Sequence, residues 1–306
     1  MNVSEWSLII FTVLGQMAVG SFIILGAIHF YAMRKAGVEE ADRLSDRVLI
    51  AIVIVMFLGF LASVAHLGNP LNAPKSIANI GTSWLSREIL LGVVFAAFAG
   101  LFTLMQWQKI GSFAVRNVVA VISAIIGIGL VASMSMIYMM ETQPGWNTFQ
   151  TPLAFFTTAL LLGSVALGAA LVANYSIVKR RNPDCEEVQC ELMHGALRWL
   201  AVISIVALGV EFIFIPMYLS RLAAIGNEAA MTASMMTSDF GVIFAFRLLL
   251  AFIGAGVLGM FIYQHSQEPE SETALMTFAY ASFVLVLSAE VLGRFLFYAT
   301  QVQIGI

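Results

Sequence analysis

The sequence predicts an all-α integral membrane protein, a bundle of eight transmembrane helices. Hydrophobic residues make up 60% of the 306 residues and charged residues only 11%, whereas soluble domains carry about 25% charged residues. The mean hydropathy is +0.92. The apolar runs are long and continuous, which indicates helices and not the short alternating strands of a membrane barrel. The polar remainder is too small for a soluble domain, so residues 1–306 are expected to form one transmembrane domain.

Each expected span is long and apolar enough to cross the hydrocarbon core, which takes about 20 residues. The connections are short, as in an up-and-down bundle. The expected spans are 7–32, 46–67, 86–107, 116–139, 151–174, 195–220, 240–263 and 273–298.

Basic residues gather in alternate connections. Of the 15 Lys and Arg residues, ten lie in or beside the connections after the first, third and fifth spans, and five lie on the opposite side. The positive-inside rule places the larger group in the cytoplasm. Both termini are therefore expected on the outer side of the membrane.

Residues that start or stop helices agree with these spans. Gly68 and Pro70 follow the second span and prevent its continuation. Thr151 and Pro152 open the fifth span, where proline is tolerated in the first turn.

The third and sixth spans carry features close to candidate site residues. Ser86 is a candidate cap for the third span, which would place Glu88 in the first turn, where the helix dipole favours an anion. Pro216 lies inside the sixth span and is expected to kink it near Glu211.

Polar side chains within the spans gather in the outer half of the membrane. Each ionisable group costs roughly 2.5–3.5 kcal/mol at the membrane centre, so such groups usually face the bundle interior or a wet cavity. The inner half is expected to carry much less, mainly His29. The outer set comprises Gln16, His66, Arg87, Glu88, Glu211, Asp239, Arg247, Glu290 and Arg294. Their clustering predicts a polar pocket that opens outward.

Some of these charges also fit purely structural roles. Glu290 and Arg294 are four residues apart and can pair on one helix face, locking the eighth span. Arg247 can neutralise Asp239 or Glu211. A histidine that ends a transmembrane helix is often only an interfacial residue. These interpretations stay open at the level of sequence.

His66 and Glu88 are candidates for the proton chemistry of a lipid-soluble quinol. Oxidation of a quinol by two electrons releases two protons, which need acceptors. Histidine titrates near neutrality, and a partly desolvated carboxylate can titrate in a useful range. His66 ends the second span and Glu88 begins the third on the same side, so they can address the two oxygens of one ring. The surrounding apolar spans would hold an isoprenoid tail.

The histidine pattern does not favour a resident haem or metal. A b-type haem needs two axial ligands at matching depth on facing helices. Among His29, His66, His194 and His265, His66 has no partner on its side. Cys185 and Cys190 are too few for an iron–sulfur cluster or a structural zinc site. Electrons are therefore expected to leave directly to a redox centre in a partner protein.

Two glycine patterns imitate a dinucleotide-binding fingerprint. Residues 254–259 read GAGVLG and residues 127–132 read GIGLVA. Both lie inside expected spans with no preceding strand, so we interpret them as small residues that allow close helix packing. The sequence contains no serine-nucleophile constellation, phosphate loop or nucleic-acid motif.

The chain resembles the membrane anchor subunits of bacterial dimethyl sulfoxide (DMSO) reductase and related molybdoenzymes over nearly its whole length. The resemblance is strongest at 6–16 (WSLIIFTVLGQ), at 66–70 (HLGNP) with the polar stretch up to Glu88, and at 289–298 (AEVLGRFLFY). It implies eight spans in a bacterial inner membrane, with both termini on the periplasmic side. It also implies a haem-free menaquinol-oxidising anchor and electron transport in anaerobic respiration. It links His66 and Glu88 to quinol oxidation.

The resemblance also implies partner subunits and divides the reaction between them and the anchor. A four-cluster, ferredoxin-like iron–sulfur subunit and a molybdopterin catalytic subunit would dock beside the anchor, so those cofactors belong to the partners. The anchor would not reduce the terminal acceptor itself but would carry the quinol-oxidation site. The acceptor stays open between DMSO, other S- or N-oxides and other sulfur compounds. The sequence departs from the family in the polar loop 176–194 and the acidic loop 266–272.

Two other functions remain as alternatives. A secondary transporter or proton-conducting subunit would need inverted repeats or a polar trail through the membrane, and the sequence shows neither. A purely structural anchor would use its buried charges only for pairing. The short electron path from an outer quinol site favours docking of the catalytic subunits on the outer face.

Overall fold

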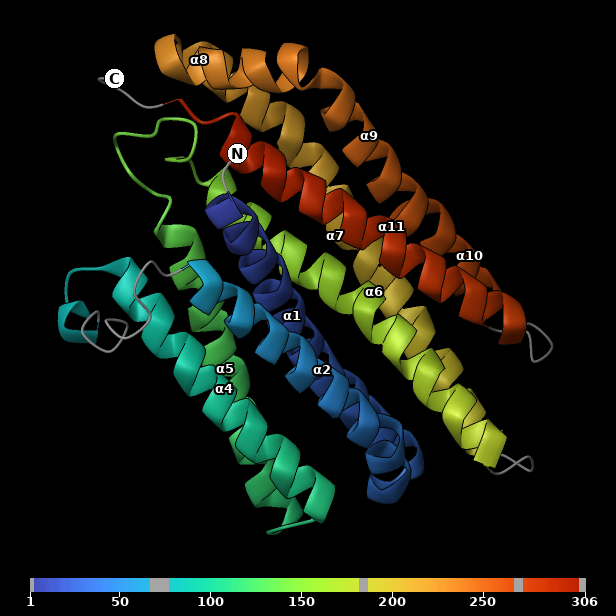
Figure 1. Cartoon of the computed structure of the whole chain (residues 1–306). Coiled ribbons are helices and arrows are strands. Elements are labelled where there is room, and N and C mark those ends of the chain that lie inside the picture. The colour runs from blue at the N-terminus through green and yellow to red at the C-terminus, as the bar shows by residue number, and fades with distance from the viewer. Residues whose placement is uncertain (1–2, 67–76, 182–186, 267–271, 303–306) are drawn as a thin grey trace.

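The structure, a computed structural model, describes residues 3–66, 77–181, 187–266 and 272–302. These residues form eight helical spans of membrane length, as the sequence predicts (Figure 1). Seven spans are the single helices α1 (Val3–Ala36), α2 (Val38–His66), α4 (Trp84–Gln108), α5 (Phe113–Met136), α6 (Gln150–Arg181), α7 (Glu187–Ile225) and α11 (Glu272–Ala299). The seventh span in sequence order joins α9 (Gly241–Ala251), a π-helical segment η4 (Phe252–Val257) and α10 (Leu258–His265).

Helices α1 and α6 form the centre of the bundle. In each of them 78% of the most apolar stretch is buried, against 17–39% in the other six spans. The two helices cross where Gly20 of α1 meets Ala159 and Gly163 of α6. A Cβ atom on Gly20 would overlap with the Ala159 carbonyl oxygen, so only glycine permits this backbone approach.

The bundle has two distinct ends. We call the end that holds the first residues of α1 and the last residues of α11 the termini end (Figure 1). The other end, where Gly37 joins α1 to α2 and residues 109–112 join α4 to α5, is the hairpin end. The two termini therefore share one side, while the membrane face that this side represents stays a prediction.

The helices at the hairpin end are longer than predicted. Helix α2 starts at Val38, so residues 38–45 are helical instead of forming a polar connection. The expected loop 176–194 is also largely helical, because α6 continues to Arg181 and α7 starts at Glu187. Hydropathy detects only the part of a helix inside the lipid, and these polar extensions lie beyond that part.

Two local predictions near the site were wrong or incomplete. Ser83, and not Ser86, caps α4, since its side chain accepts a hydrogen bond from the Ser86 backbone N–H. Helix α4 therefore starts at Trp84, and Glu88 falls after the first turn. Pro216 lies inside α7, which continues beyond it to Ile225.

The connection between α7 and α9 is helical as well. It holds α8 (Asn227–Ser234) and the π-helical segment η3 (Met235–Asp239), and it covers the termini end (Figure 1). Leu222 and Ala229 are fully buried there and pack with Tyr218. A short 3-10 helix, η2 (Ile77–Asn79), precedes α4 at the same end.

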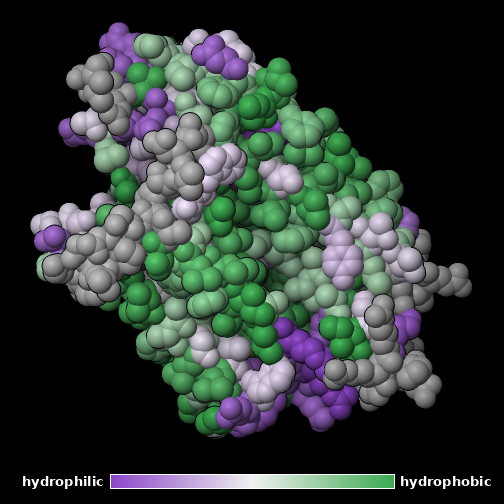
Figure 2. Space-filling view, viewed as in Figure 1, coloured by the Kyte–Doolittle hydropathy of each residue, from purple (hydrophilic) through white to green (hydrophobic). Residues whose placement is uncertain are grey.

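The surface fits a bilayer. Hydrophobic side chains cover the middle of the face shown in Figure 2, and polar side chains gather toward its ends. Large apolar side chains that point outward include Ile125, Val206, Val242 and Val284. The pattern matches lipid contact around a packed interior.

The GAGVLG stretch serves helix packing, as interpreted from the sequence. A Cβ on Gly254 would come within 2.8 Å of Val286 Cγ2 on α11. The Gly254 carbonyl accepts a hydrogen bond of 2.8 Å from Ser282 Oγ. Gly254 thus allows η4 and α11 to approach closely.

Candidate functional site

A cavity of about 130 Å³ lies near the termini end between α6, α7, α9 and α11. Its walls are mainly apolar, with Phe214, Phe244 and Phe297 among them. An engineered apolar cavity of roughly 150 Å³ binds benzene, so this cavity has the size for one aromatic ring. Its polar wall consists of Gln150, Thr151, Thr157, Thr158, Tyr218, Glu211, Arg247, Glu290 and Arg294.

Arg247 of α9 lies between two carboxylates in this wall. Its guanidinium binds Glu211 of α7 and lies 3.7 Å from Glu290 of α11. Thr158 of α6 donates a hydrogen bond of 2.6 Å to the other oxygen of Glu290. Two other helices, α6 and α9, therefore contact the Glu290 carboxylate of α11. Of the two partners that the sequence left open for Arg247, the structure selects Glu211, while Asp239 is exposed in η3.

Several buried polar atoms of this cluster lack hydrogen-bond partners among the described residues. They are Oε2 of Glu211, Oε1 of Glu290 and Nε of Arg247. Buried polar atoms are nearly always hydrogen-bonded in native proteins. Two of the three are acceptors, so the cavity offers its lone pairs to a molecule that donates hydrogen bonds, such as one that carries hydroxyl groups.

Arg294 of α11 forms a second polar group beside the first. It donates a hydrogen bond of 3.0 Å to Gln16 of α1, and its guanidinium lies 3.9 Å from the centre of the Phe155 ring. Arg294 lies within electrostatic range of Glu290, as the spacing allowed, while its hydrogen bond and ring contact go to α1 and α6. Gln16 is fully buried, and its Nε2 lacks a partner among the described residues.

Glu88 lies near a pair of tyrosines. Its side chain is buried in α4, and it interacts electrostatically with Tyr138 and Tyr298. The two phenol oxygens are 2.6 Å apart. Arg294 also lies within electrostatic range of both tyrosines. Glu88 and Arg294 thus both lie within electrostatic range of the tyrosine pair, and Glu88 itself does not line the cavity.

Tyr138 follows α5 outside the membrane span, in the connection to α6. Burial raises the pKa of its phenol well above the ordinary value, so it stays protonated at neutral pH. Trp146 of the same connection stacks on Phe297 with ring centres 5.0 Å apart and donates a hydrogen bond of 2.9 Å to the Phe297 carbonyl. This aromatic packing fixes the connection against α11.

Of the predicted site residues whose side chains the structure describes, Gln16, Arg87 and Glu88 do not line the cavity. Arg87 donates hydrogen bonds to the carbonyls of Ile80 (2.9 Å) and Gly81 (2.8 Å) and lies over Trp84. It thus holds the connection that leads into α4. His66 is the last residue of α2, and its side chain lies outside the described residues, as does the rest of the HLGNP stretch.

Some residues of the site were not identified from the sequence. Thr158, Tyr138 and Tyr298 each contribute a hydroxyl to it. Threonine and tyrosine are ordinary residues in membrane helices, so their type carries no signal. Only their contact with a buried charge marks them, and this contact is a property of the tertiary structure.

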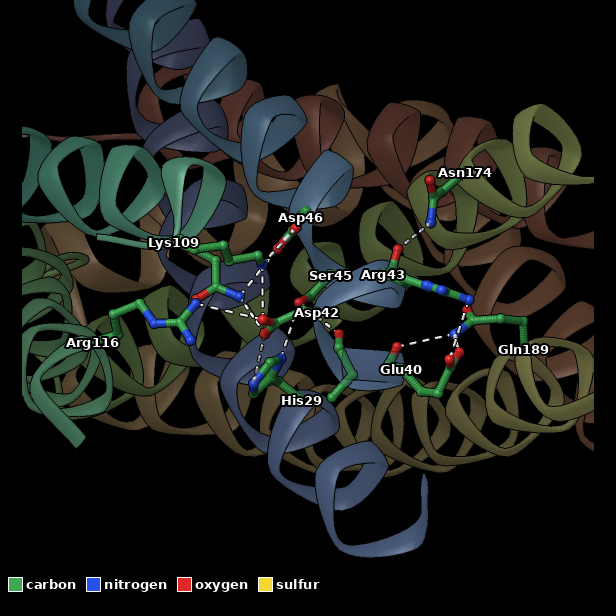
Figure 3. Close-up of polar contacts among 12 residues, drawn as sticks. His29, Glu40, Asp42, Arg43, Ser45, Asp46, Lys109, Arg116, Asn174 and Gln189 are labelled. Atoms are coloured by element: carbon green, nitrogen blue, oxygen red, sulfur yellow. Dashed lines mark hydrogen bonds and ion pairs between the residues drawn. The ribbon is translucent and has the colours of Figure 1, made fainter. Parts of the chain in front are cut away.

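The hairpin end holds a polar network that is larger than the sequence predicts (Figure 3). Lys109 binds Asp42 and Asp46 at 2.8 and 2.9 Å. Gln106 donates to both carboxylates and accepts a hydrogen bond of 2.8 Å from Arg116. His29 joins through Asp42, at 3.7 Å. The polar residues therefore do not gather in one leaflet alone. The reason is that α2 extends to Val38 and carries Asp42 into the bundle.

The described residues contain no group of three or more His, Cys, Asp or Glu side chains that could hold a metal ion.

Comparison with known proteins decides the family. The family model described as DMSO reductase anchor subunit (DmsC) matches residues 1–300. The chain belongs to the DMSO reductase anchor subunit family. It is a membrane anchor and a multi-pass protein of the inner membrane.

Individual relatives agree with this assignment. The DmsC-type C subunit of the anaerobic dimethyl sulfoxide reductase of Escherichia coli (strain K12) is 30% identical over 303 residues, which cover 98% of this protein and 96% of the relative. The YnfH subunit of an anaerobic dimethyl sulfoxide reductase of the same organism is 32% identical over 302 residues, with the same coverage. The C subunit of the Haemophilus influenzae enzyme is 26% identical over 310 residues, which cover 98% of this protein and 96% of that one.

Membership in the DMSO reductase anchor family implies that the chain works beside catalytic and electron-transfer subunits. This membership is consistent with cofactors that are carried by the partner subunits.

Proposed function

We propose that this anchor binds menaquinol at the termini end, oxidises it, and passes the electrons to an iron–sulfur subunit. That subunit would be of the four-cluster ferredoxin-like type and would feed a molybdopterin subunit that reduces DMSO or a related oxide. The anchor itself contains no haem in this proposal. The proposed quinol-binding residues are Gln16, His66, Arg87, Glu88, Glu211, Arg247, Glu290 and Arg294.

The observation that carries the proposal is a pair of carboxylates, each with an oxygen that lacks a hydrogen bond, beside a cavity the size of one ring. Glu211 and Glu290 both pair with Arg247, yet each retains a buried acceptor atom with no hydrogen-bond partner among the described residues. A quinol carries two hydroxyl donors on an aromatic ring, which matches two buried acceptors in an aromatic-lined cavity. Arg247 keeps the carboxylates from repelling each other before the ligand binds.

The same residues suggest a route for the protons. Two protons and two electrons leave each quinol. The electrons go to the partner's iron–sulfur centre. The protons pass from the cavity toward Glu88 through the Tyr298 and Tyr138 hydroxyls, which are 2.6 Å apart, and from Glu88 to His66 at the end of α2. In this proposal His66 and Glu88 accept protons, and Arg87 fixes the connection beside them.

The test compares two electron donors for the intact complex. A soluble menaquinol analogue must use the anchor, whereas a reduced viologen dye can deliver electrons to the partner subunits directly. We expect Glu290→Gln to lower the quinol-driven rate by roughly tenfold or more, because it removes a charged acceptor worth about 1.5–3 kcal/mol. The dye-driven rate should not change.

Glu228→Gln is the matched control, because Glu228 lies in α8 outside the cavity. If Glu290→Gln and Glu211→Gln both oxidise the quinol analogue at the rate of the unaltered complex, the cavity is not the quinol site. If His66→Ala also retains that rate while the complex stays in the membrane, the proposal that this anchor oxidises quinol is wrong.

A proton-conducting subunit is the second candidate, and the network around Asp42 and Lys109 favours it, since it adds ionisable groups at the hairpin end. This function predicts proton uptake by vesicles that contain the anchor alone. Quinol oxidation predicts proton release only while an acceptor is being reduced.

The partner subunits are proposed to dock at the termini end, since the electron path from the cavity is shortest there. Cross-linking from Asn79 or Thr82, beside η2, to the iron–sulfur subunit checks this placement. Cross-links found only from the hairpin end would contradict it.

A further inference from the structure

A second, larger cavity lies at the hairpin end, away from the proposed quinol site. It has a volume of about 1000 Å³ and lies between α1, α7 and α10. Its residues come from the last turns of α1, the first turns of α7 and the end of α10, so it lies where the helices leave the lipid. Nothing in the proposed electron transfer uses it.

One part of the cavity is cationic. Lys35 and Arg198 line it, together with the hydroxyl-bearing side chains of Tyr31 and Tyr263 and with His194. The one carboxylate in the described lining, Glu191, binds Lys35 at 2.6 Å and has a side chain that is 63% exposed. The described lining thus contains two cations, Lys35 and Arg198, and one carboxylate, Glu191. It therefore carries one net positive charge.

Arg198 is held in position for a ligand. It donates a hydrogen bond of 2.8 Å to Tyr263 Oη, and its guanidinium lies 4.7 Å from the centre of the Tyr263 ring. A guanidinium has five N–H donors in a rigid fork that suits phosphate oxygens. The contact with Tyr263 therefore orients Arg198 while other donors stay available to a phosphate.

The other part of the cavity is apolar and faces the lipid. Trp199 and Val202 line it, and Trp199 is 55% exposed. Tryptophan favours the membrane interface, where its ring contacts acyl chains and its N–H contacts water. The cavity thus combines two cations, Lys35 and Arg198, with the apolar side chains of Trp199 and Val202, and Val202 lies one turn further along α7 than Arg198.

We propose that this cavity binds one anionic phospholipid, with the phosphodiester between Lys35 and Arg198 and an acyl chain along Trp199 and Val202. Basic cavities between transmembrane helices are suited to anionic headgroups. A soluble phosphate would use only the cationic part and leave the apolar part without a partner. The lipid would bridge α1, α7 and α10 and stabilise their packing at the hairpin end.

The test uses the full-length protein in its purified complex, in a neutral detergent. The melting midpoint and the number of retained lipids are measured while phosphatidylglycerol, phosphatidylcholine or inorganic phosphate is added. Phosphatidylglycerol should raise the midpoint and remain bound at one molecule per anchor. The double variant Lys35→Gln/Arg198→Gln should bind it about tenfold more weakly, the loss expected when a charge-assisted contact is removed.

Arg34→Gln is the control. Arg34 is adjacent to Lys35, lies over Phe30, and does not line the cavity, so this variant should bind the lipid as the unaltered protein does. If the double variant does not fold, Tyr263→Phe replaces it, because it keeps both cations and releases only Arg198.

Three results would overturn the proposal. The first is equal stabilisation by phosphatidylglycerol of the unaltered protein and of the Lys35→Gln/Arg198→Gln variant, or of Tyr263→Phe where that variant replaces it. The second is an equal effect of phosphatidylcholine, which would show a general lipid effect. The third is a rise of the melting midpoint with inorganic phosphate alone that equals the rise with phosphatidylglycerol, which would assign the cavity to a free anion.

Discussion

At the residue scale, the position of Arg247 depends on a glycine. A Cβ atom on Gly293 would overlap with the Arg247 guanidinium. Gly293 thus makes room for the side chain that holds Glu211 and Glu290. Thr158 fixes the second oxygen of Glu290 from another helix. The arrangement leaves little freedom for any of these side chains.

We predict that Gly293→Ala displaces Arg247 and weakens quinol binding. The added methyl group occupies the place of the guanidinium, so the two carboxylates lose their shared cation. The KM for a quinol analogue should rise by roughly tenfold, the equivalent of about 1.4 kcal/mol. Gly209→Ala is the control, because a Cβ there meets no atom within 4 Å. Equal KM values for the two variants would contradict the prediction.

We predict that Tyr298→Phe slows quinol oxidation and changes its pH profile. The substitution breaks the 2.6 Å contact with Tyr138 and leaves a buried hydroxyl without its partner, which costs about 1–3 kcal/mol. Steady-state rates on both sides of neutral pH, where histidine titrates, measure the effect. Tyr280→Phe on the exposed side of α11 is the control. A loss of stability with an unchanged pH profile would show that the pair is only structural.

At the scale of elements, the crossing of α1 and α6 organises the bundle. Gly20 and Gly163 let the two backbones touch, and the other helices pack around this pair. The crossing also sets the relative position of Gln16 on α1 and Thr158 on α6. Those residues contact Arg294 and Glu290 on α11, so the packing of two helices positions the polar wall of the site.

We predict that Gly20→Ala destabilises the protein by about 1–3 kcal/mol, the usual cost of overpacking. The obstacle is the Ala159 backbone, which cannot rotate away as a side chain can. The melting midpoint in detergent should fall relative to Gly26→Ala on the same helix, where a Cβ meets no atom within 4 Å. A midpoint that does not fall would mean that α1 and α6 can move apart without a loss of stability, and would contradict the prediction.

At the scale of the whole molecule, polar groups lie near both ends of the bundle and apolar surface lies between them. The termini end holds the cavity with Arg247, and the hairpin end holds the network around Asp42 (Figure 3). We propose different roles for the two ends. The termini end exchanges electrons and protons. The hairpin end holds α2, α4 and α5 together and contacts the lipid headgroups.

We predict that the purified anchor shows no b-type α-band in a reduced-minus-oxidised optical spectrum. Electrons are proposed to pass from the quinol directly to the partner's iron–sulfur centre, so the anchor needs no haem. The partner subunits purified without the anchor provide the control sample. A haem band that remains with the isolated anchor would contradict the direct route.

Much of the architecture could be predicted from the sequence alone. Apolar runs of about 20 residues leave a helix as the main way to satisfy the backbone in lipid, so the membrane-embedded part of all eight spans was predicted. Charges are rare in such spans, so Glu88, Glu211, Arg247, Glu290 and Arg294 were visible as candidates. The family resemblance rested on the same kind of local pattern.

The tertiary structure decided which of those residues meet. Spacing along one helix suggested that Glu290 pairs with Arg294, but Arg247 and Thr158 approach Glu290 from other helices. The role of Gly293 and the contact between Tyr138 and Tyr298 also depend on segments far apart in sequence. Composition and periodicity determine which segments enter the membrane, because transfer into lipid is a property of each segment. Pairing depends on which helix faces pack together, and only the folded bundle determines that.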